Sequence, residues 1–166
     1  MPAIKALALD VDGVLTDGGF WWGTDGTEWK RFCFADVMGL SLARKSGMLL
    51  AIISGEDNPL IDRFAGKLGI TNIWKGCTDK ARALVFFAER NDLSLDEICF
   101  MGDDVNDLPA LEIAGLPAAP ADARPVVLER CGFITTAKAG NGAVRELVDY
   151  LLASQTVAVL AQEPKL

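Results

Sequence analysis

The chain has 166 residues, a net charge of −7, 51% hydrophobic residues and no histidine. This length suits one domain with a full core. The acidic balance and the lack of a basic block argue against a nucleic-acid partner or an anionic membrane, and the longest apolar stretches, such as 48–53, are too short to span a bilayer. Without histidine, His-based triads and imidazole acid–base catalysis are excluded.

The cysteines lie far apart, at positions 33, 77, 99 and 131, and form no Cys-x-x-Cys pair. The first residues contain no signal-like segment. We therefore expect reduced thiols in a cytoplasmic protein.

In chain order, the apolar run 4–9 predicts a buried strand that ends at Asp10, Asp12 and Gly13. Residues 18–34 then predict a β-hairpin around the Asp25-Gly26 turn. Further strands are expected at 48–53, 72–74, 98–101 and 132–134, with a short segment at 116–118. Helices are expected at 36–45, 59–68, 78–90, 107–114, 123–130 and 143–152.

Strands and helices alternate along most of the chain. This order predicts an α/β fold with a doubly wound, Rossmann-like parallel sheet, a hairpin insertion and no cap domain. We expect one domain over 1–154 and a C-terminal tail over 155–166.

Polar residues follow the ends of successive predicted strands: Asp10 and Asp12, Ser54 and Gly55, and Asp103 and Asp104 with Asp107, while Lys80 starts a helix. Taken singly, each has a structural interpretation, such as a turn, a calcium-loop fragment, a solvated lysine or a helix N-terminus. Because the carboxyl ends of parallel strands form one crevice, their shared placement instead indicates a catalytic site. Two convergent carboxylates suggest a divalent cation and phosphate chemistry.

The order of these motifs resembles that of the haloacid dehalogenase-like phosphatases: 10–16 as the first motif, Ser54 as the second, Lys80 as the third and 102–107 as the fourth. The resemblance implies that Asp10 is the nucleophile, which forms an aspartyl-phosphate, and that Asp12 exchanges protons with the leaving group and the attacking water.

The same resemblance implies that Asp10, Asp103 and the backbone oxygen of Asp12 hold Mg²⁺. It assigns phosphate binding to Ser54 and Gly55, and charge stabilisation to Lys80. Asp107 would orient Lys80 or a metal-bound water, with Asp104 nearby in a supporting position.

The intervals between motifs leave no room for a cap. Asp12 and Ser54 are 42 positions apart and Lys80 and Asp103 are 23 positions apart, both filled by predicted elements, whereas an inserted domain needs about 50 residues. The aromatic hairpin is too apolar for a free-standing ribbon, and it could pack on its own domain or on another subunit. Segments 16–18, 26–30, 53–55, 68–70 and 142–146 resemble those of the capless tetrameric phosphatases of 3-deoxy-2-ulosonic acid phosphates. This resemblance implies a homotetramer in which a neighbouring subunit covers the site.

Substrates of that subgroup include octulosonate 8-phosphate and nonulosonate 9-phosphates. Glu56 and Lys67 resemble the nonulosonate enzymes, although a surface ion pair between them is an equal interpretation. Arg145 could bind the substrate carboxylate or be an ordinary exposed helical arginine.

Two other functions compete with this interpretation. One is a noncatalytic oligomerisation module of the kind found with sugar-nucleotide synthetases, and the other is a phosphatase of another small metabolite. The presence of Asp10, Asp12, Lys80 and Asp103 argues against the first.

Overall fold

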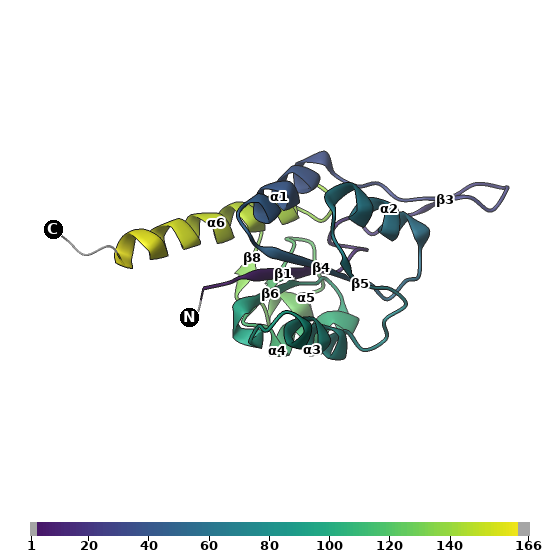
Figure 1. Ribbon diagram of the computed structural model, residues 1–166. Helices are drawn as coiled ribbons and strands as arrows, with labels where there is room; N and C mark the ends of the chain where they lie inside the picture. The colour runs from purple at the N-terminus through teal and green to yellow at the C-terminus, as the bar shows by residue number, and fades with distance from the viewer. Residues whose placement is uncertain (1–2, 163–166) are drawn as a thin grey trace.

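The computed structural model describes residues 3–162, and side chains up to residue 154. Six parallel strands form one sheet in the order β5-β4-β1-β6-β7-β8 (Figure 1). Their bounds are β1 Ala6–Leu9, β4 Leu49–Ile53, β5 Asn72–Trp74, β6 Ile98–Met101, β7 Leu116–Ala119 and β8 Phe133–Ile134. The predicted doubly wound α/β sheet is confirmed.

Helices cover both faces of this sheet (Figure 1). One face carries α1 Phe34–Lys45, α2 Pro59–Leu68 and α6 Ala143–Gln162. The other carries α3 Lys80–Arg90, α4 Leu108–Ile113 and α5 Pro125–Leu128. Two short 3₁₀ turns, η1 Leu95–Glu97 and η2 Val105–Asp107, precede β6 and α4.

The central strand β1 shows why the sheet is buried on both faces. Its side chains alternate, so Leu7 and Leu9 enter the core beneath α1 and α6, while Ala6 and Ala8 enter the core beneath α3 and α4. All four residues are fully buried. β1 lies between β4 and β6, so the carboxyl ends of three adjacent strands meet at one edge.

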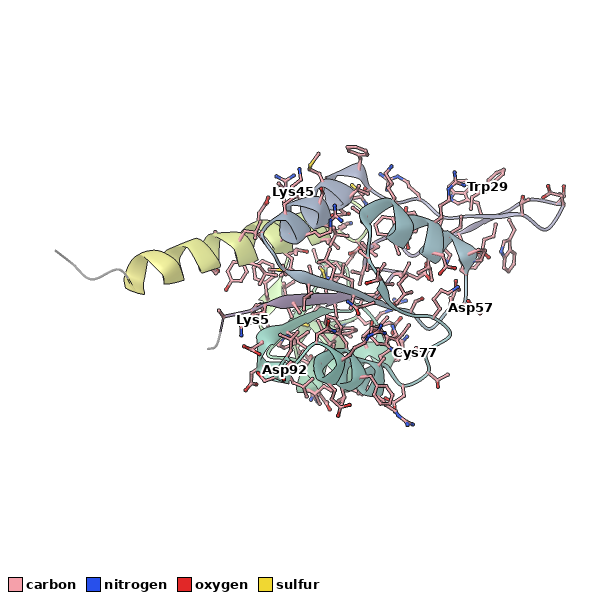
Figure 2. The ribbon with its side chains drawn as sticks, in the orientation of Figure 1. Lys5, Trp29, Lys45, Asp57, Cys77 and Asp92 are labelled. Atoms are coloured by element: carbon pink, nitrogen blue, oxygen red, sulfur yellow. The ribbon has the colours of Figure 1, made fainter. Side chains whose placement is uncertain are left out.

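The hairpin consists of β2 Trp21–Trp22 and β3 Glu28–Trp29, paired antiparallel around Asp25-Gly26. Gly23 N–H donates to the carbonyl of Thr27 at 2.8 Å and closes the turn. The hairpin projects from the body of the molecule, at the end opposite the C-terminal part of α6 (Figure 1). Figure 2 shows Trp29 on this projecting arm.

Five of the six predicted helices differ from their predicted bounds: α1 starts two residues earlier than predicted and α3 two residues later, and the other three differ as follows. α5 starts at Pro125 instead of 123, because proline fits the first helical turn but not the interior. α4 starts later than predicted because η2 comes first, where the Asp104 side chain accepts from Val105 N–H at 2.7 Å. α6 continues past 152 to Gln162, since no glycine or proline interrupts residues 153–163. The last four residues of the predicted tail, 163–166, lie outside the described residues.

Over the described part of the chain, no helix combines the length and the apolar character that crossing a bilayer requires.

Candidate active site

A cavity of about 310 Å³ opens at the carboxyl ends of β1, β4 and β6. The elements of four predicted motifs meet there, although they are up to 94 positions apart in the sequence. Eight of the predicted residues line it: Asp10, Asp12, Ser54, Gly55, Glu56, Lys80, Asp103 and Asp104. Asp107 lies behind it, in contact with Lys80.

Gly13 brings the loops after β1 and β6 close together. Its φ of +84° is in the left-handed region, and a Cβ built on it would lie 2.1 Å from Oδ2 of Asp103. The following backbone turns sharply, because the N–H groups of Leu15 and Thr16 both donate to the Val11 carbonyl. Glycine therefore allows the carboxylates of two motifs to share the cavity.

Lys80 joins two buried carboxylates. Its Nζ lies 2.9 Å from Oδ1 of Asp10 and 2.6 Å from Oδ1 of Asp107, and all three side chains are almost fully buried. Burial lowers the pKa of Lys80, but the charges of Asp10 and Asp107 outweigh it, so the pKa stands above its usual value. Lys80 is therefore charged at neutral pH and fixed against Asp10.

Asp107 also organises the loop after β6. Its Oδ2 accepts from the N–H groups of Asp103 at 2.8 Å and Asp104 at 3.2 Å. A Cβ at Gly102 would lie 2.5 Å from the Asp107 side chain, so this loop packs directly on the carboxylate. Asp104 caps η2, and the hydrogen bond from Val105 N–H, followed by one from Arg124, holds the pKa of Asp104 below its usual value.

Three carboxylates have the arrangement of a cation site. Asp10, Asp103 and Asp107 each offer an oxygen within 4.8 Å of the others. Burial, reinforced by the neighbouring carboxylates, raises the pKa of both Asp10 and Asp103 to about 7. Oδ1 of Asp103 is buried and has no hydrogen-bond partner within the described structure. An unpartnered carboxylate oxygen beside a second acidic group fits a hard divalent cation such as Mg²⁺.

The other predicted metal residue, Asp12, directs its side chain elsewhere. Both of its oxygens lie 2.8 Å from Nζ of Lys30, which comes from the end of the hairpin. This arrangement is compatible with the prediction that Asp12 offers a cation only its backbone oxygen. Asp107 is the third carboxylate of the cluster, but its Oδ1 is already paired with Lys80 Nζ.

Ser54 follows β4, is buried and lines the cavity. Its backbone is fixed on both sides: its N–H donates to Trp74 O at 2.8 Å, and its carbonyl accepts from Cys77 N–H at 2.9 Å. Its Oγ accepts from Glu56 N–H at 3.2 Å, which leaves the hydroxyl proton available to an anion. Gly55 lies next to it on the cavity wall.

The predicted specificity residues separate in the structure. Glu56 lines the catalytic cavity, and its carboxylate binds Lys30 instead of Lys67. Lys67 lines a neighbouring cavity of about 300 Å³ and lies over the Phe34 ring, 5.7 Å from its centroid. The proposed surface ion pair between Glu56 and Lys67 is therefore replaced by a Glu56–Lys30 pair.

Arg145 lies apart from the residues that line the cavity. Its Nε binds Asp149 one helical turn further along α6 at 2.9 Å, and its N–H donates to buried Asp36 on α1. These contacts correspond to the structural interpretation of Arg145 given above.

Sequence reasoning assigned no role to three residues that the fold brings to the site: Lys30, Arg124 and Asn106, which lies within the fourth motif. Asn106 and Arg124 line the cavity, and Arg124 Nε binds Asp104 at 3.2 Å. Burial alone would lower the pKa of Lys30. Hydrogen bonds to Asp12 and Glu56 raise the pKa by more than burial lowers it, so it stands above its usual value. The sequence signal for Lys30 was its place at the end of segment 26–30, directly after the aromatic residue Trp29 of the hairpin.

Residues 41–147 match the family model of the haloacid dehalogenase-like hydrolases. The chain belongs to this family. The 3-deoxy-D-manno-octulosonate 8-phosphate phosphatase KdsC of Escherichia coli (strain K12) is 38% identical over 152 residues, which is 92% of this chain and 81% of the relative. Haloacid dehalogenase-like relatives of this kind identify the chain as a phosphoric monoester hydrolase.

Solved structures of haloacid dehalogenase-like enzymes confirm the fold. The octulosonate phosphatase of Yersinia pestis has a TM-score of 0.90 and 36% identity, covering 92% of this chain and 83% of the relative. The octulosonate phosphatase of Moraxella catarrhalis was solved in complex with magnesium ion, phosphate ion and a KDO molecule. It has a TM-score of 0.89 and 38% identity, covering 95% of this chain and 92% of the relative.

Proposed function

We propose that the chain is a Mg²⁺-dependent phosphatase of a 3-deoxy-2-ulosonic acid phosphate, either octulosonate 8-phosphate or a nonulosonate 9-phosphate. The observation that carries this proposal is the buried Asp10–Lys80–Asp107 arrangement beside an unpartnered oxygen of Asp103. The relatives support the substrate class, because both the curated and the solved ones include octulosonate 8-phosphate phosphatases.

The reaction has two steps. The Asp10 carboxylate attacks phosphorus, the ester P–O bond breaks, and Asp12 gives its proton to the departing alkoxide. Asp12, now a carboxylate, takes a proton from water; the resulting hydroxide attacks the aspartyl-phosphate, releases inorganic phosphate and restores Asp10. The two steps together return Asp10 and Asp12 to their starting protonation states.

The remaining residues hold the transferred group. Lys80 stabilises the negative charge shared by Asp10 and the phosphoryl group, and Asp107 keeps Lys80 in place. Ser54 Oγ–H and the Gly55 backbone donate to phosphate oxygens. Asp10, Asp103 and the backbone oxygen of Asp12 would hold Mg²⁺, which would supply positive charge that lets an anionic nucleophile approach an anionic ester.

The single experiment is phosphate release, with and without Mg²⁺, from a panel of octulosonate 8-phosphate, nonulosonate 9-phosphates and hexose phosphates, compared as kcat/KM. A preference for the nine-carbon acids would support a specificity role for Glu56 and Lys67. A preference for the eight-carbon acid would remove that role. A preference for hexose phosphates would indicate another small metabolite, and no release from any ester would favour the noncatalytic module.

We further propose a homotetramer in which a neighbouring subunit covers the open cavity. The hairpin supports this, because Trp22 is 73% exposed and Trp29 63% exposed on an arm that projects from the body (Figure 2). Apolar surface of this kind is typical of a subunit contact. Light scattering after size exclusion tests it, with Trp22→Ser expected to lower the mass of the particle.

A further inference from the structure

Lys30 connects the hairpin to the catalytic cavity. It follows β3 directly, and its side chain is fully buried, at 0% exposure, although the hairpin around it is largely exposed. Its Nζ lies 2.8 Å from both oxygens of Asp12 and also donates to Oε2 of Glu56. Oε1 of Glu28 lies 4.0 Å away on the same side.

These contacts fix the Asp12 carboxylate. The Lys30 ammonium group faces both oxygens of Asp12 and so prevents rotation of the carboxylate about its Cβ–Cγ bond. Thr16 Oγ1 also donates to Oδ1 of Asp12, at 3.3 Å. Proton transfer requires the carboxyl group to stay within hydrogen-bond reach of the leaving oxygen. Lys30 is thus placed to keep Asp12 in one orientation throughout the reaction.

Glu56 has a corresponding effect on Lys30. A lysine side chain is long and flexible, and a second carboxylate holds its Nζ at one point. Glu28 Oε1 in turn accepts from Asn58 Nδ2 at 2.6 Å, which joins β3 to the start of α2. The end of the hairpin is therefore fixed to the loop that carries Glu56.

We propose that Lys30 is a positioning residue for ester cleavage, holding the Asp12 carboxylate in place for proton transfer while Glu56 anchors Lys30. This inference rests on the proposed function, since it assigns Lys30 to the same reaction. It also gives Glu56 a part in the chemistry that is separate from any choice of sugar acid.

The alternative is that Lys30 only fixes the hairpin to the domain. Lys75 provides a matched control, because its Nζ also bridges two carboxylates, Asp57 at 2.8 Å and Asp62 at 2.7 Å. It braces the outer side of the loop that contains Glu56, away from Asp12. Loss of a bridge that is merely structural should have similar effects at both lysines.

The test is the dependence of kcat/KM on the leaving group in a series of aryl and alkyl phosphates. Poor leaving groups need the proton from Asp12, whereas nitrophenolate departs without it. In Lys30→Met we expect kcat/KM to fall on the order of 100-fold for alkyl esters and less than about 3-fold for p-nitrophenyl phosphate. Lys30→Arg should recover part of the loss.

Two comparisons decide the interpretation. Asp12→Asn should show the same steep leaving-group dependence, and adding Lys30→Met to it should change little further. Lys75→Met should keep the wild-type dependence. Equal losses for alkyl and aryl esters in Lys30→Met, or equal effects of the two lysine variants, would overturn the proposal.

A second readout does not depend on turnover. Acetylation by acetic anhydride, followed by mass spectrometry, should modify Lys30 at least about 10-fold more slowly than Lys75, and Asp12→Asn should remove part of that protection. Protection of Lys30 in a protein that hydrolyses no ester would refute the proposed function but leave the contact intact. An active enzyme whose Lys30→Met variant keeps the wild-type leaving-group dependence would refute the inference alone.

Discussion

At Gly13 a single hydrogen atom in place of a side chain lets the first and fourth motifs meet. We predict that Gly13→Ala weakens Mg²⁺ binding at least about 10-fold, because the new methyl group would displace the Asp103 carboxylate. Backbone strain at φ +84° should cost a further 1–2 kcal/mol of stability, roughly. Isothermal titration with Mg²⁺ and urea unfolding measure the two effects.

Gly26 at the hairpin turn is the matched control. It has the same φ of +84°, but an added Cβ would meet no atom within 4 Å. Gly26→Ala should therefore reproduce the strain without the loss of Mg²⁺ affinity. Equal affinities in the two variants would contradict the steric role of Gly13.

Asp10→Asn tests the nucleophile. An amide cannot attack phosphorus as a carboxylate does, so we expect kcat to fall by about 10³-fold or more. The fold should persist, because the amide oxygen can still accept from Lys80. Phosphate release and circular dichroism check both statements, and near-normal turnover would exclude Asp10 as the nucleophile.

The residues predicted from the sequence are those whose position follows from strand ends. Asp10 and Ser54 come directly after a buried strand and Asp103 comes two residues after one, so the parallel sheet brings them together at one edge. Lys30 could not be predicted in this way. Its contact with Asp12 depends on how the hairpin folds back, which no local pattern encodes.

Among the elements, α1 and α6 are joined by a buried acid. Asp36 accepts from the N–H groups of Gly142 at 3.3 Å and Arg145 at 2.9 Å, at the start of α6. Burial raises the pKa of Asp36 above its usual value. The side chain thus caps one helix from another, across more than a hundred residues of sequence.

We predict that Asp36→Ala lowers the free energy of unfolding by about 1–3 kcal/mol, because two buried N–H groups lose their acceptor. Urea unfolding measures the change. Asp149→Ala, which removes only an exposed partner of Arg145, should cost less than about 1 kcal/mol. Similar losses of unfolding free energy in both variants would contradict a stabilising role of the buried Asp36 cap.

Helix bounds were predictable where the ends carry their own signals. α2 matches its prediction at both ends, since Asn58 and Pro59 start it and Gly69, at φ +65°, ends it. η2 was not predicted, because it depends on a capping box between Asp104 and Asp107 that also serves the site. Residues with two roles are hard to assign from local propensity.

For the whole molecule, the acidic cavity links stability to both pH and Mg²⁺. Asp10 and Asp103 have pKa values near 7 in the metal-free fold and 3.8 as ordinary aspartates. The folded state therefore holds more protons between about pH 4 and 7, and the contribution of these groups to stability falls as pH rises through that range.

Mg²⁺ should reverse this effect, because it binds the deprotonated carboxylates. We predict that the Mg²⁺-induced rise in Tm is larger at pH 8 than at pH 5. Thermal unfolding with Mg²⁺ or a chelator at each pH measures it, and Asp103→Asn should reduce the difference. A rise in Tm that is the same at both pH values would contradict the raised pKa values.

The projecting hairpin also gives the molecule an optical reporter. Three of the four tryptophans of the chain, Trp21, Trp22 and Trp29, are exposed on the hairpin. The fourth, Trp74, packs against Phe87 with ring centroids 6.0 Å apart. Intrinsic fluorescence is therefore dominated by the surroundings of the arm. A blue shift of the emission with increasing protein concentration would follow burial of the arm directly, without any label.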